Sequence, residues 1–501
     1  MNRRNFLKTV AGAGAAYTTW HATPALATEP ASTPAIFQPR ADITPYVANF
    51  VVQAKYTDLS PDVIALGKKS LLDAFGLAII GAHSPGSRIM QNYLKSLGYT
   101  DGQAVVLGTK DRLPLRFAAL ANGVSIHMED FDDTQLPVPG DNNFGQVIHP
   151  TAPVFPAALG YADTHAITGR EFMLAFHVGA EVACKIADAC SARAYKTGFH
   201  ASGIFGMFGS AAAIAKLRGL DVTMTSNALA LAASQASGLA ENFGTLTKPF
   251  QVGHAAEAGV VAADLAALGW DGSKTALEGA NGLFHSYGGD YKPEYLLHKL
   301  GQPWSFASPG VAIKPYPSGA VSHPAMTEMA RLIRAHGIKA RDVESVETGT
   351  SSLIPKYLHY HQPTKGLEGK FSMEFCLAVL LVVGKAGLGE YTDEVVNRAD
   401  IQDMMRRIHF SVDPEIEASL SSRNATNLYI QLKNGQIFTS RVEFGKGSPA
   451  NPMSYDEVAE KFRGCTDFAH WPAERAVKII ELIRNLESLP DVSTLSALCV
   501  G

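Results

Sequence analysis

The chain has 501 residues, with 43 lysines and arginines against 47 acidic residues and a formal net charge of −4. Hydrophobic residues make up 46% and charged residues 18%, which excludes an intrinsically disordered chain and indicates a large buried core. The near-neutral charge argues against nucleic acid as a partner, and five cysteines are too few for a disulfide scaffold.

Residues 1–27 are typical of an export signal. Arg3 and Arg4 begin it, an Ala/Gly-rich stretch of moderate hydrophobicity follows, and Ala25-Leu26-Ala27 is typical of a cleavage site. The segment resembles a twin-arginine signal, so we expect the twin-arginine export machinery to deliver the folded protein to the periplasm, with a mature net charge of −7. The stretch is too short and polar for a membrane anchor, and no later stretch is long enough to span a bilayer.

The cysteines fit an oxidising periplasm only in part. Their number is odd and they form no C-x-x-C motif, so at least one stays unpaired or pairs between chains. Cys184 and Cys190 lie six residues apart, and a disulfide between them is left open.

A helical pattern follows a Pro/Thr/Ala-rich lead-in at residues 28–45 and continues to about residue 305. Ser60-Pro61 is typical of a helix start. Small residues dominate four later segments, which predicts buried, closely packed helices. These segments are Ala152–Ala158, Gly203–Lys216, Ala228–Gly238 and Ala255–Gly269. The glycines at 203–209 lack the G-x-G-x-x-G order and an upstream strand, which favours helix packing over nucleotide binding.

The composition changes after Trp304. Strand-like segments are Val343–Ser351, Arg407–Val412, Asn427–Leu432 and Phe438–Phe444, with a hairpin turn at Lys433–Gln436. Helical segments are Ala325–Ala335, Cys376–Gly384, Asp400–Met405 and the C-terminal Ser454–Leu489. We therefore predict a mainly α fold in which a large all-helical domain, residues 28–305 and 447–501, is interrupted by a smaller α+β lid domain, residues 306–446.

Five polar segments stand within this apolar chain. They are Asn122–Thr134, Ile148–Thr151, Gly198–Gly203, Thr247–Ala256 and Ile313–His323. They repeat one design, a lysine or histidine at a Gly/Pro turn before a small-residue helix, whose N-terminus attracts anions. Several such helix ends meeting in one place predict a site for a small polycarboxylate.

The first segment carries four acids at residues 129–133, a pattern that fits either a metal site or a charged helix end. No zinc pair, Walker loop, nucleophile elbow or iron–sulfur motif occurs in the sequence. We therefore expect acid–base chemistry without a cofactor.

In this order the segments resemble the MmgE/PrpD family, from about residue 43 to residue 490. The likeness also rests on the motifs Asp-Phe-Asp-Asp-Thr at 130–134, Lys-Pro-Tyr-Pro-Ser at 314–318 and Phe-Ser-Met-Glu-Phe at 371–375. The resemblance implies an all-helical domain with an α+β lid, a homodimer, no metal, and an active site in the cleft between the domains.

The resemblance also implies the site residues. The catalytic candidates are Asp130, His149, His200 and Lys248, and the substrate-binding candidates are Thr134, Lys314, His254, His323, Tyr316 and Ser318. Three features depart from the family pattern. Gly319 stands where the decarboxylase members have a histidine, Phe375 stands where many members have a tyrosine, and the loop at 135–148 is longer than expected. The first two favour another activity over decarboxylation.

The implied chemistry is proton movement at a carbon beside a carboxylate. We expect Lys248 and Lys314 to stabilise the enolate-like anion, and His149 or His200 to transfer the proton. Asp130 either tunes an imidazole or itself accepts a proton. The leading hypothesis is a dehydratase of a hydroxy di- or tricarboxylate such as 2-methylcitrate. The alternatives are an epimerase, isomerase or decarboxylase of a related acid, and a periplasmic carboxylate-binding protein without turnover.

Overall fold

The computed structural model describes residues 42–99, 102–135, 148–190, 194, 197–289, 291–419 and 425–501. The export signal predicted at 1–27, nearly all of the lead-in and the loop at 136–147 lie outside the described residues.

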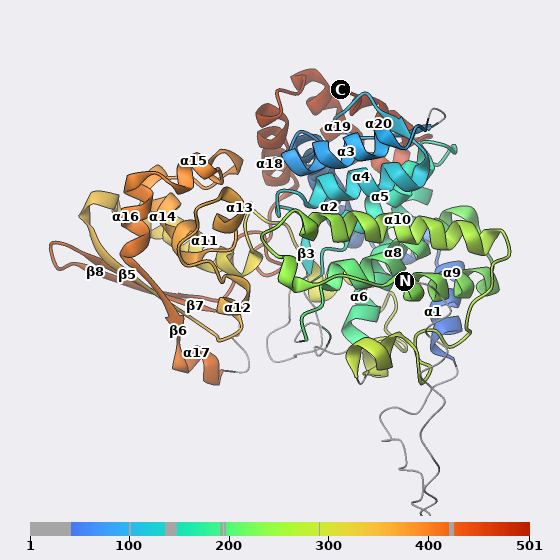
Figure 1. Ribbon diagram of the computed structural model, residues 1–501, viewed down its shortest axis with the longest axis horizontal. Coiled ribbons are helices and arrows are strands. Elements are labelled where there is room, and N and C mark those ends of the chain that lie inside the picture. The colour runs from blue at the N-terminus through green and yellow to red at the C-terminus, as the bar shows by residue number, and fades with distance from the viewer. Residues whose placement is uncertain are drawn as a thin grey trace, which may run out of the picture. The chain divides into compact units, whose positions relative to one another are not determined.

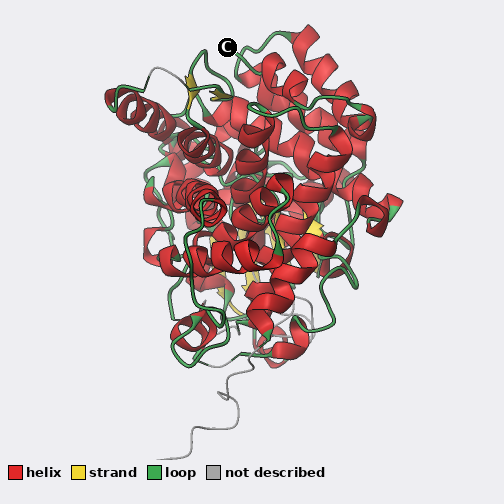
Figure 2. Cartoon of the chain, turned by 90° about the vertical axis from the view of Figure 1, so that its right-hand side faces the viewer, coloured by secondary structure: helices red, strands yellow, loops and turns green. Residues whose placement is uncertain are grey.

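Helices dominate the described chain, which confirms the mainly α prediction (Figures 1 and 2). The helices before residue 305 are α1 (Ile43–Gln53), α2 (Pro61–Gly81), α3 (Pro85–Ser96), α4 (Leu115–His127), α5 (Thr151–Ala162), α6 (Gly169–Ala189), α8 (Ala201–Arg218), α9 (Val222–Gln235) and α10 (Thr247–Ala267). The C-terminal helices α18 (Tyr455–Phe468), α19 (Ala473–Arg484) and α20 (Ser493–Leu498) pack on the same core.

Local signals set the ends of these helices. The Ser60 hydroxyl accepts from the Val63 amide at the start of α2, with Pro61 at its first position. Ser454 and Glu457 form a capping box on α18. Helix α8 ends at Gly219, whose φ of +64° suits the left-handed C-cap.

The glycine-rich segment of α8 lets two helices approach closely, as the sequence predicts. A Cβ on Gly209 would lie 2.7 Å from the Gly179 carbonyl oxygen of α6, and one on Gly179 would lie 2.6 Å from the Gly209 oxygen. Gly206 meets the Pro153 ring of α5 in the same way. No nucleotide loop is needed to explain these glycines.

Gly209→Ala is therefore expected to destabilise the fold by about 1–3 kcal/mol, because the added methyl group overpacks the contact of α6 with α8. Chemical denaturation monitored by circular dichroism measures the change. Gly464→Ala in α18 is the matched control, because a Cβ there meets nothing within 4 Å. We expect it to stabilise the fold by about 0.5–1 kcal/mol through the helix preference of alanine. Equal effects of the two substitutions would contradict the close packing.

A second hydrophobic core lies in residues 325–432. Its sheet has the order β6-β5-β7-β8, made of β5 (Val343–Thr350), β6 (Ile408–Val412), β7 (Thr426–Leu432) and β8 (Ile437–Val442). Strand β5 pairs parallel with β6 and antiparallel with β7, and β7 pairs antiparallel with β8 across the predicted turn. Helices of this part are α11 (His323–His336), α12 (Ile354–Tyr357), α13 (Gly366–Gly369), α14 (Met373–Val383), α15 (Asp393–Val396), α16 (Ala399–Arg406) and α17 (Pro414–Ala418).

Alternation sets the buried face of this sheet. Leu428 and Ile430 of β7 point to the core, where α11, α14 and α16 cover the sheet (Figure 1). The two cores separate the helical part from the lid, and the helical core extends to Ile313. The domain boundaries at 305/306 and 446/447 stay predictions.

Two-residue strands join distant segments of the chain. Strands β1 (Ala104–Val105) and β2 (Arg112–Leu113) form one ribbon, and β3 (Thr134–Gln135) pairs with β4 (Val311–Ala312) in another. The Cys184 thiol is buried and free, so the open disulfide with Cys190 is not formed.

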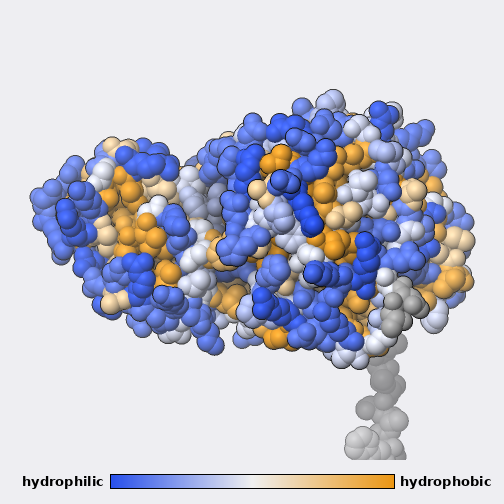
Figure 3. All heavy atoms as spheres, turned by 90° about the horizontal axis from the view of Figure 1, so that it is seen from above, coloured by the Kyte–Doolittle hydropathy of each residue, from blue (hydrophilic) through white to orange (hydrophobic). Residues whose placement is uncertain are grey.

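Hydrophilic side chains predominate on the face drawn in Figure 3, and hydrophobic ones form separate patches between them. Among the described helices, none combines the length and the apolar character that a membrane span requires.

Candidate active site

The loop that follows α4 places the acidic motif, residues 129–133, in the interior of the protein. Helix α4 ends at His127, and Asp130 takes a φ of +50°, which turns the backbone towards β3. Thr134 of β3 lies opposite Ala312 of β4, and this pairing brings Lys314 next to the acidic loop. The two short strands thus bring together segments that lie about 180 residues apart in the sequence.

Three helix starts supply the other polar groups, as the sequence predicts. His149 comes just before α5, His200 is the N-cap residue of α8, and Lys248 lies in the first turn of α10. Lys314 differs, because it follows a strand instead of preceding a helix. Each residue is buried.

These residues meet around one cavity of ≈ 60 Å³. Six of the predicted site residues line it: Asp130, Thr134, His149, His200, Lys248 and Lys314. They come from five separate segments of the chain, and the small size fits the reactive part of a compact organic acid. The lid contributes the opposite wall, which includes Gly319.

Four predicted substrate-binding residues lie elsewhere. His254 stacks on Phe250 and lies 3.7 Å from Glu257, because six residues along a helix rotate it about 240° from Lys248. His323 is buried, with its Nε2 3.3 Å from the Ser318 hydroxyl. Ser318 also contacts Met326, and the Tyr316 ring packs edge-on against His323 at 5.5 Å. None of the four is among the residues that line the cavity in the described chain.

Sequence reasoning missed three aromatic residues of the cavity: Phe243, Tyr357 and Phe371. Tyr357 comes from α12 of the lid. Phe371 lies in the Phe-Ser motif, but neither Phe243 nor Tyr357 stands in a motif. Phe243 and Phe371 pack with their rings 6.3 Å apart, and the Lys248 ammonium lies 5.4 and 5.6 Å from their centres.

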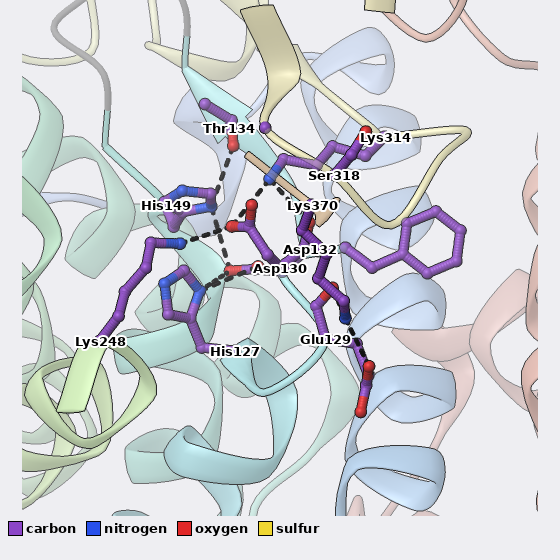
Figure 4. A network of polar contacts seen from close by, with 12 residues as sticks. His127, Glu129, Asp130, Asp132, Thr134, His149, Lys248, Lys314, Ser318 and Lys370 are labelled. Carbon is purple, nitrogen blue, oxygen red and sulfur yellow. Dashed lines mark hydrogen bonds and ion pairs between the residues drawn. The ribbon is translucent and has the colours of Figure 1, made fainter. Parts of the chain in front are cut away.

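Asp130 bridges the two lysines (Figure 4). Its Oδ1 accepts from Lys248 Nζ at 2.5 Å and from Lys314 Nζ at 3.1 Å, and Lys314 also donates to the Asp130 backbone oxygen at 2.9 Å. Burial alone would raise the pKa of Asp130, but the two ammonium groups outweigh it and hold that pKa far below its usual range. Burial lowers the pKa of Lys248. Asp130 is therefore the counter-ion of the two lysines in the structure.

His149 is held in one tautomer. Its Nδ1 lies 2.9 Å from the backbone oxygen of Asp133, which can only accept, so Nδ1 carries the proton. Thr134 Oγ1 lies 2.9 Å from the same nitrogen. The lone pair is then on Nε2. Burial lowers the pKa of His149, so the ring is neutral near pH 7 and ready to accept a proton.

His200 is arranged in the same way. Its Nδ1 lies 2.7 Å from Gln251 Oε1, and the Gln251 amide nitrogen donates to the Leu239 carbonyl, which fixes the orientation of the amide. His200 Nδ1 therefore donates, and its buried Nε2 has no hydrogen-bond partner among the described residues. Burial holds the pKa of His200 well below its usual value.

The four acids of residues 129–133 each have a partner of their own. Glu129 pairs with Lys370, Asp130 with two lysines, Asp132 with two histidines, and Asp133 with the Thr151 hydroxyl. His127, Asp130 and His149 have potential ligand atoms within 4.8 Å of one another. A cation bound there would lie beside the ammonium groups of Lys248 and Lys314, so the charges around this group do not favour a metal.

A second ion pair ties the lid to the acidic loop. The buried Lys370 ammonium donates to Glu129 Oε2 at 2.5 Å and to its backbone oxygen at 2.7 Å, and Ser84 donates to Glu129 Oε1. The Lys370 carbonyl accepts from the amide of Gly319, a wall residue. Lys370 thus holds the lid wall against the loop that carries Asp130.

Lys370→Met is expected to destabilise the fold by about 1–3 kcal/mol, because it leaves the partly buried carboxylate of Glu129 without its charged partner. Urea denaturation measures the change. Lys478→Met in α19 is the matched control, because Lys478 and its partner Glu481 are 56% and 61% exposed. There we expect about 1 kcal/mol or less. Similar losses in both variants would show that the pair of Lys370 with Glu129 has no special role.

Comparison with known proteins agrees with this architecture. The family model of the MmgE/PrpD N-terminal domain matches residues 46–296, and that of the C-terminal domain matches residues 316–488. The chain is 29% identical over 472 residues to the cis-aconitate decarboxylase of Homo sapiens, covering 92% of this chain and 95% of that protein. It is 26% identical over 483 residues to the cis-aconitate decarboxylase of Aspergillus terreus, covering 91% and 95%.

Proposed function

The chain belongs to the MmgE/PrpD family, and from this premise we propose that it is a cofactor-independent lyase that removes water from a hydroxy di- or tricarboxylate such as 2-methylcitrate. One observation carries the proposal. A neutral imidazole with its lone pair on Nε2, that of His149, shares a buried cavity with two ammonium groups. The imidazole can take a proton from a carbon beside a carboxylate, and the ammonium groups can stabilise the anion that forms.

The reaction divides between the two imidazoles. His149 Nε2 takes the proton from the substrate carbon, and the electron pair moves into a carboxylate held by Lys248 and Lys314. His200 Nδ1 contacts the neutral Gln251 amide and no carboxylate among the described residues, so we assign it the role of proton donor. After taking a proton from solvent as the polyanion binds, it protonates the leaving hydroxyl. The products are water and an unsaturated acid.

Decarboxylation is the second candidate, because the relatives named above are cis-aconitate decarboxylases. Replacing the carboxyl group by hydrogen needs a proton donor at carbon. Gly319, at the position where the decarboxylase members have a histidine, supplies no side chain to the cavity wall. This feature supports elimination.

The test uses the purified mature protein with a panel of hydroxy and unsaturated polycarboxylates in heavy water, followed by proton NMR. A dehydratase converts a hydroxy acid to an unsaturated acid, and it incorporates deuterium in the reverse hydration. Release of carbon dioxide would favour the decarboxylase, and exchange without net conversion would favour an epimerase. Binding without exchange for every acid would contradict an enzyme and favour the carboxylate-binding protein.

Location and assembly are part of the same proposal. Residues 1–27 support twin-arginine export to the periplasm, and the family supports a homodimer. Fractionation of cells with an Arg3→Lys/Arg4→Lys variant tests the first, because that variant should stay in the cytoplasm. Light scattering of the mature protein tests the second.

A further inference from the structure

A single carboxylate, that of Asp132, lies between two histidines of the site (Figure 4). Both of its oxygens are 2.9 Å from His127 Nδ1, and its Oδ2 is 3.2 Å from His149 Nδ1. Asp132 and His127 are each 1% exposed, and His149 is 6% exposed. The three groups therefore interact in a dry environment, where each contact is stronger than at the surface.

The contacts fix the protons on both rings. An ionised carboxylate can only accept, so His127 Nδ1 donates to it. The same carboxylate lies within ion-pair distance of His149 Nδ1, where its negative charge favours a protonated Nδ1. The backbone oxygen of Asp133 imposes the same state on His149 independently. Both rings then keep their lone pairs on Nε2. The His127 Nε2 is buried without a hydrogen-bond partner among the described residues, and the His127 ring lies 4.6 Å from the His149 ring.

Asp130, two residues earlier, has a different environment. Two ammonium groups contact its Oδ1, whereas the ion-pair partners of Asp132 among the described residues are the two imidazoles. A positive charge formed on His149 is therefore compensated directly by Asp132. The sequence leaves open two roles for Asp130, and one of them is to tune an imidazole. The contacts assign that role to Asp132 instead.

We propose that Asp132 is the positioning residue of the proton-transfer base: it holds His149 with Nδ1 protonated and Nε2 free, and it stabilises the imidazolium that forms when Nε2 takes the substrate proton. His127 holds the carboxylate in place from its other side. The proton moves from the substrate carbon to His149 Nε2, the electron pair stays on the substrate, and Asp132 remains ionised throughout. This inference rests on the proposed function.

Asp132→Asn tests the assignment, because it removes the negative charge that stabilises the imidazolium of His149 and leaves a neutral amide beside His127 Nδ1. We expect kcat to fall by about 10²–10⁴-fold, with KM nearly unchanged since Lys248 and Lys314 still bind the carboxylates. Asp163→Asn, which removes a carboxylate that accepts from the Val105 amide outside the cavity, is the matched control and should keep kcat. An Asp132→Asn enzyme with the kcat of the wild type would overturn the proposal.

Nitrogen-15 NMR of the histidines gives a readout that does not depend on activity. In the wild-type protein we expect His149 to be neutral with the proton on Nδ1, and a proton on Nε2 instead would overturn the proposal. Wild-type protein that shows this tautomer but turns over no polycarboxylate would contradict the proposed function alone.

A pair of His127 variants keeps the test decisive if Asp132→Asn does not fold. An asparagine side chain places an N–H donor where Nδ1 lies, whereas leucine has none. We expect His127→Asn to retain most of kcat and His127→Leu to lose at least 10-fold. Equal kcat in both variants would contradict the role of His127 in holding Asp132.

Discussion

We expect Lys248→Met to lower kcat by about 10²-fold or more. A 10²-fold loss corresponds to about 2.7 kcal/mol of lost transition-state stabilisation. The ammonium group is buried, lies 5.4 and 5.6 Å from the centres of the Phe243 and Phe371 rings, and forms an ion pair with Asp130. In such a dry cavity a fixed positive charge stabilises the enolate-like anion more than it stabilises the bound substrate, because the anion carries its extra charge on the carboxylate that Lys248 contacts.

Steady-state kinetics on the substrate found in the polycarboxylate screen measures the effect. Methionine keeps much of the volume of the lysine side chain, so loss of packing contributes little. Lys69→Met is the matched control, since Lys69 donates to the Met453 carbonyl from α2 and does not line the cavity. Circular dichroism verifies that both variants fold. A Lys248→Met enzyme with near-wild-type kcat would remove Lys248 from the site.

The strands of the lid were predictable because their signals are local. Residues 427–432 alternate in burial, and the Asn434-Gly435 turn supports φ of +85° at the glycine. The closely packed helices were predictable for the same reason, since glycine and alanine at contact positions leave little choice of partner. Local pattern therefore determined most of the fold that carries the site.

The roles within the acidic motif were not predictable. Which carboxylate faces the lysines and which faces the histidines depends on the left-handed backbone at Asp130 and on the pairing of β3 with β4. A single non-glycine residue with positive φ leaves no clear sequence signal. Phe243 and Tyr357 were missed because their contribution arises only when the lid meets the helical part.

His149→Gln is expected to lower kcat by about 10²–10⁴-fold, because an amide nitrogen in place of Nε2 cannot accept a proton. Hydrogen–deuterium exchange at the substrate carbon should fall by the same factor, since exchange requires the same step. His177→Gln is the matched control: His177 is a buried histidine that contacts the Met173 and Val63 carbonyls, and burial lowers its pKa to about 4. That variant should lose stability but not exchange.

The pH profile of the wild-type enzyme follows from the same assignment. The active form of His149 is neutral, and its pKa lies below the ordinary value of about 6.5 because burial penalises the imidazolium. The acid side of the kcat/KM profile should therefore fall below pH 6.5, and His149→Gln should abolish that limb. A limb that survives the substitution would show that another group titrates there.

His200→Gln separates the two imidazoles. If His200 gives its proton to the leaving hydroxyl, its loss stops elimination but leaves carbon–hydrogen exchange in place, because the His149 step precedes departure of the hydroxyl. The reverse outcome, with exchange lost in His200→Gln and kept in His149→Gln, would exchange the two roles. It would also remove the reason for Asp132 to contact His149, since the base would then have Gln251 as its partner and no carboxylate to stabilise its charge.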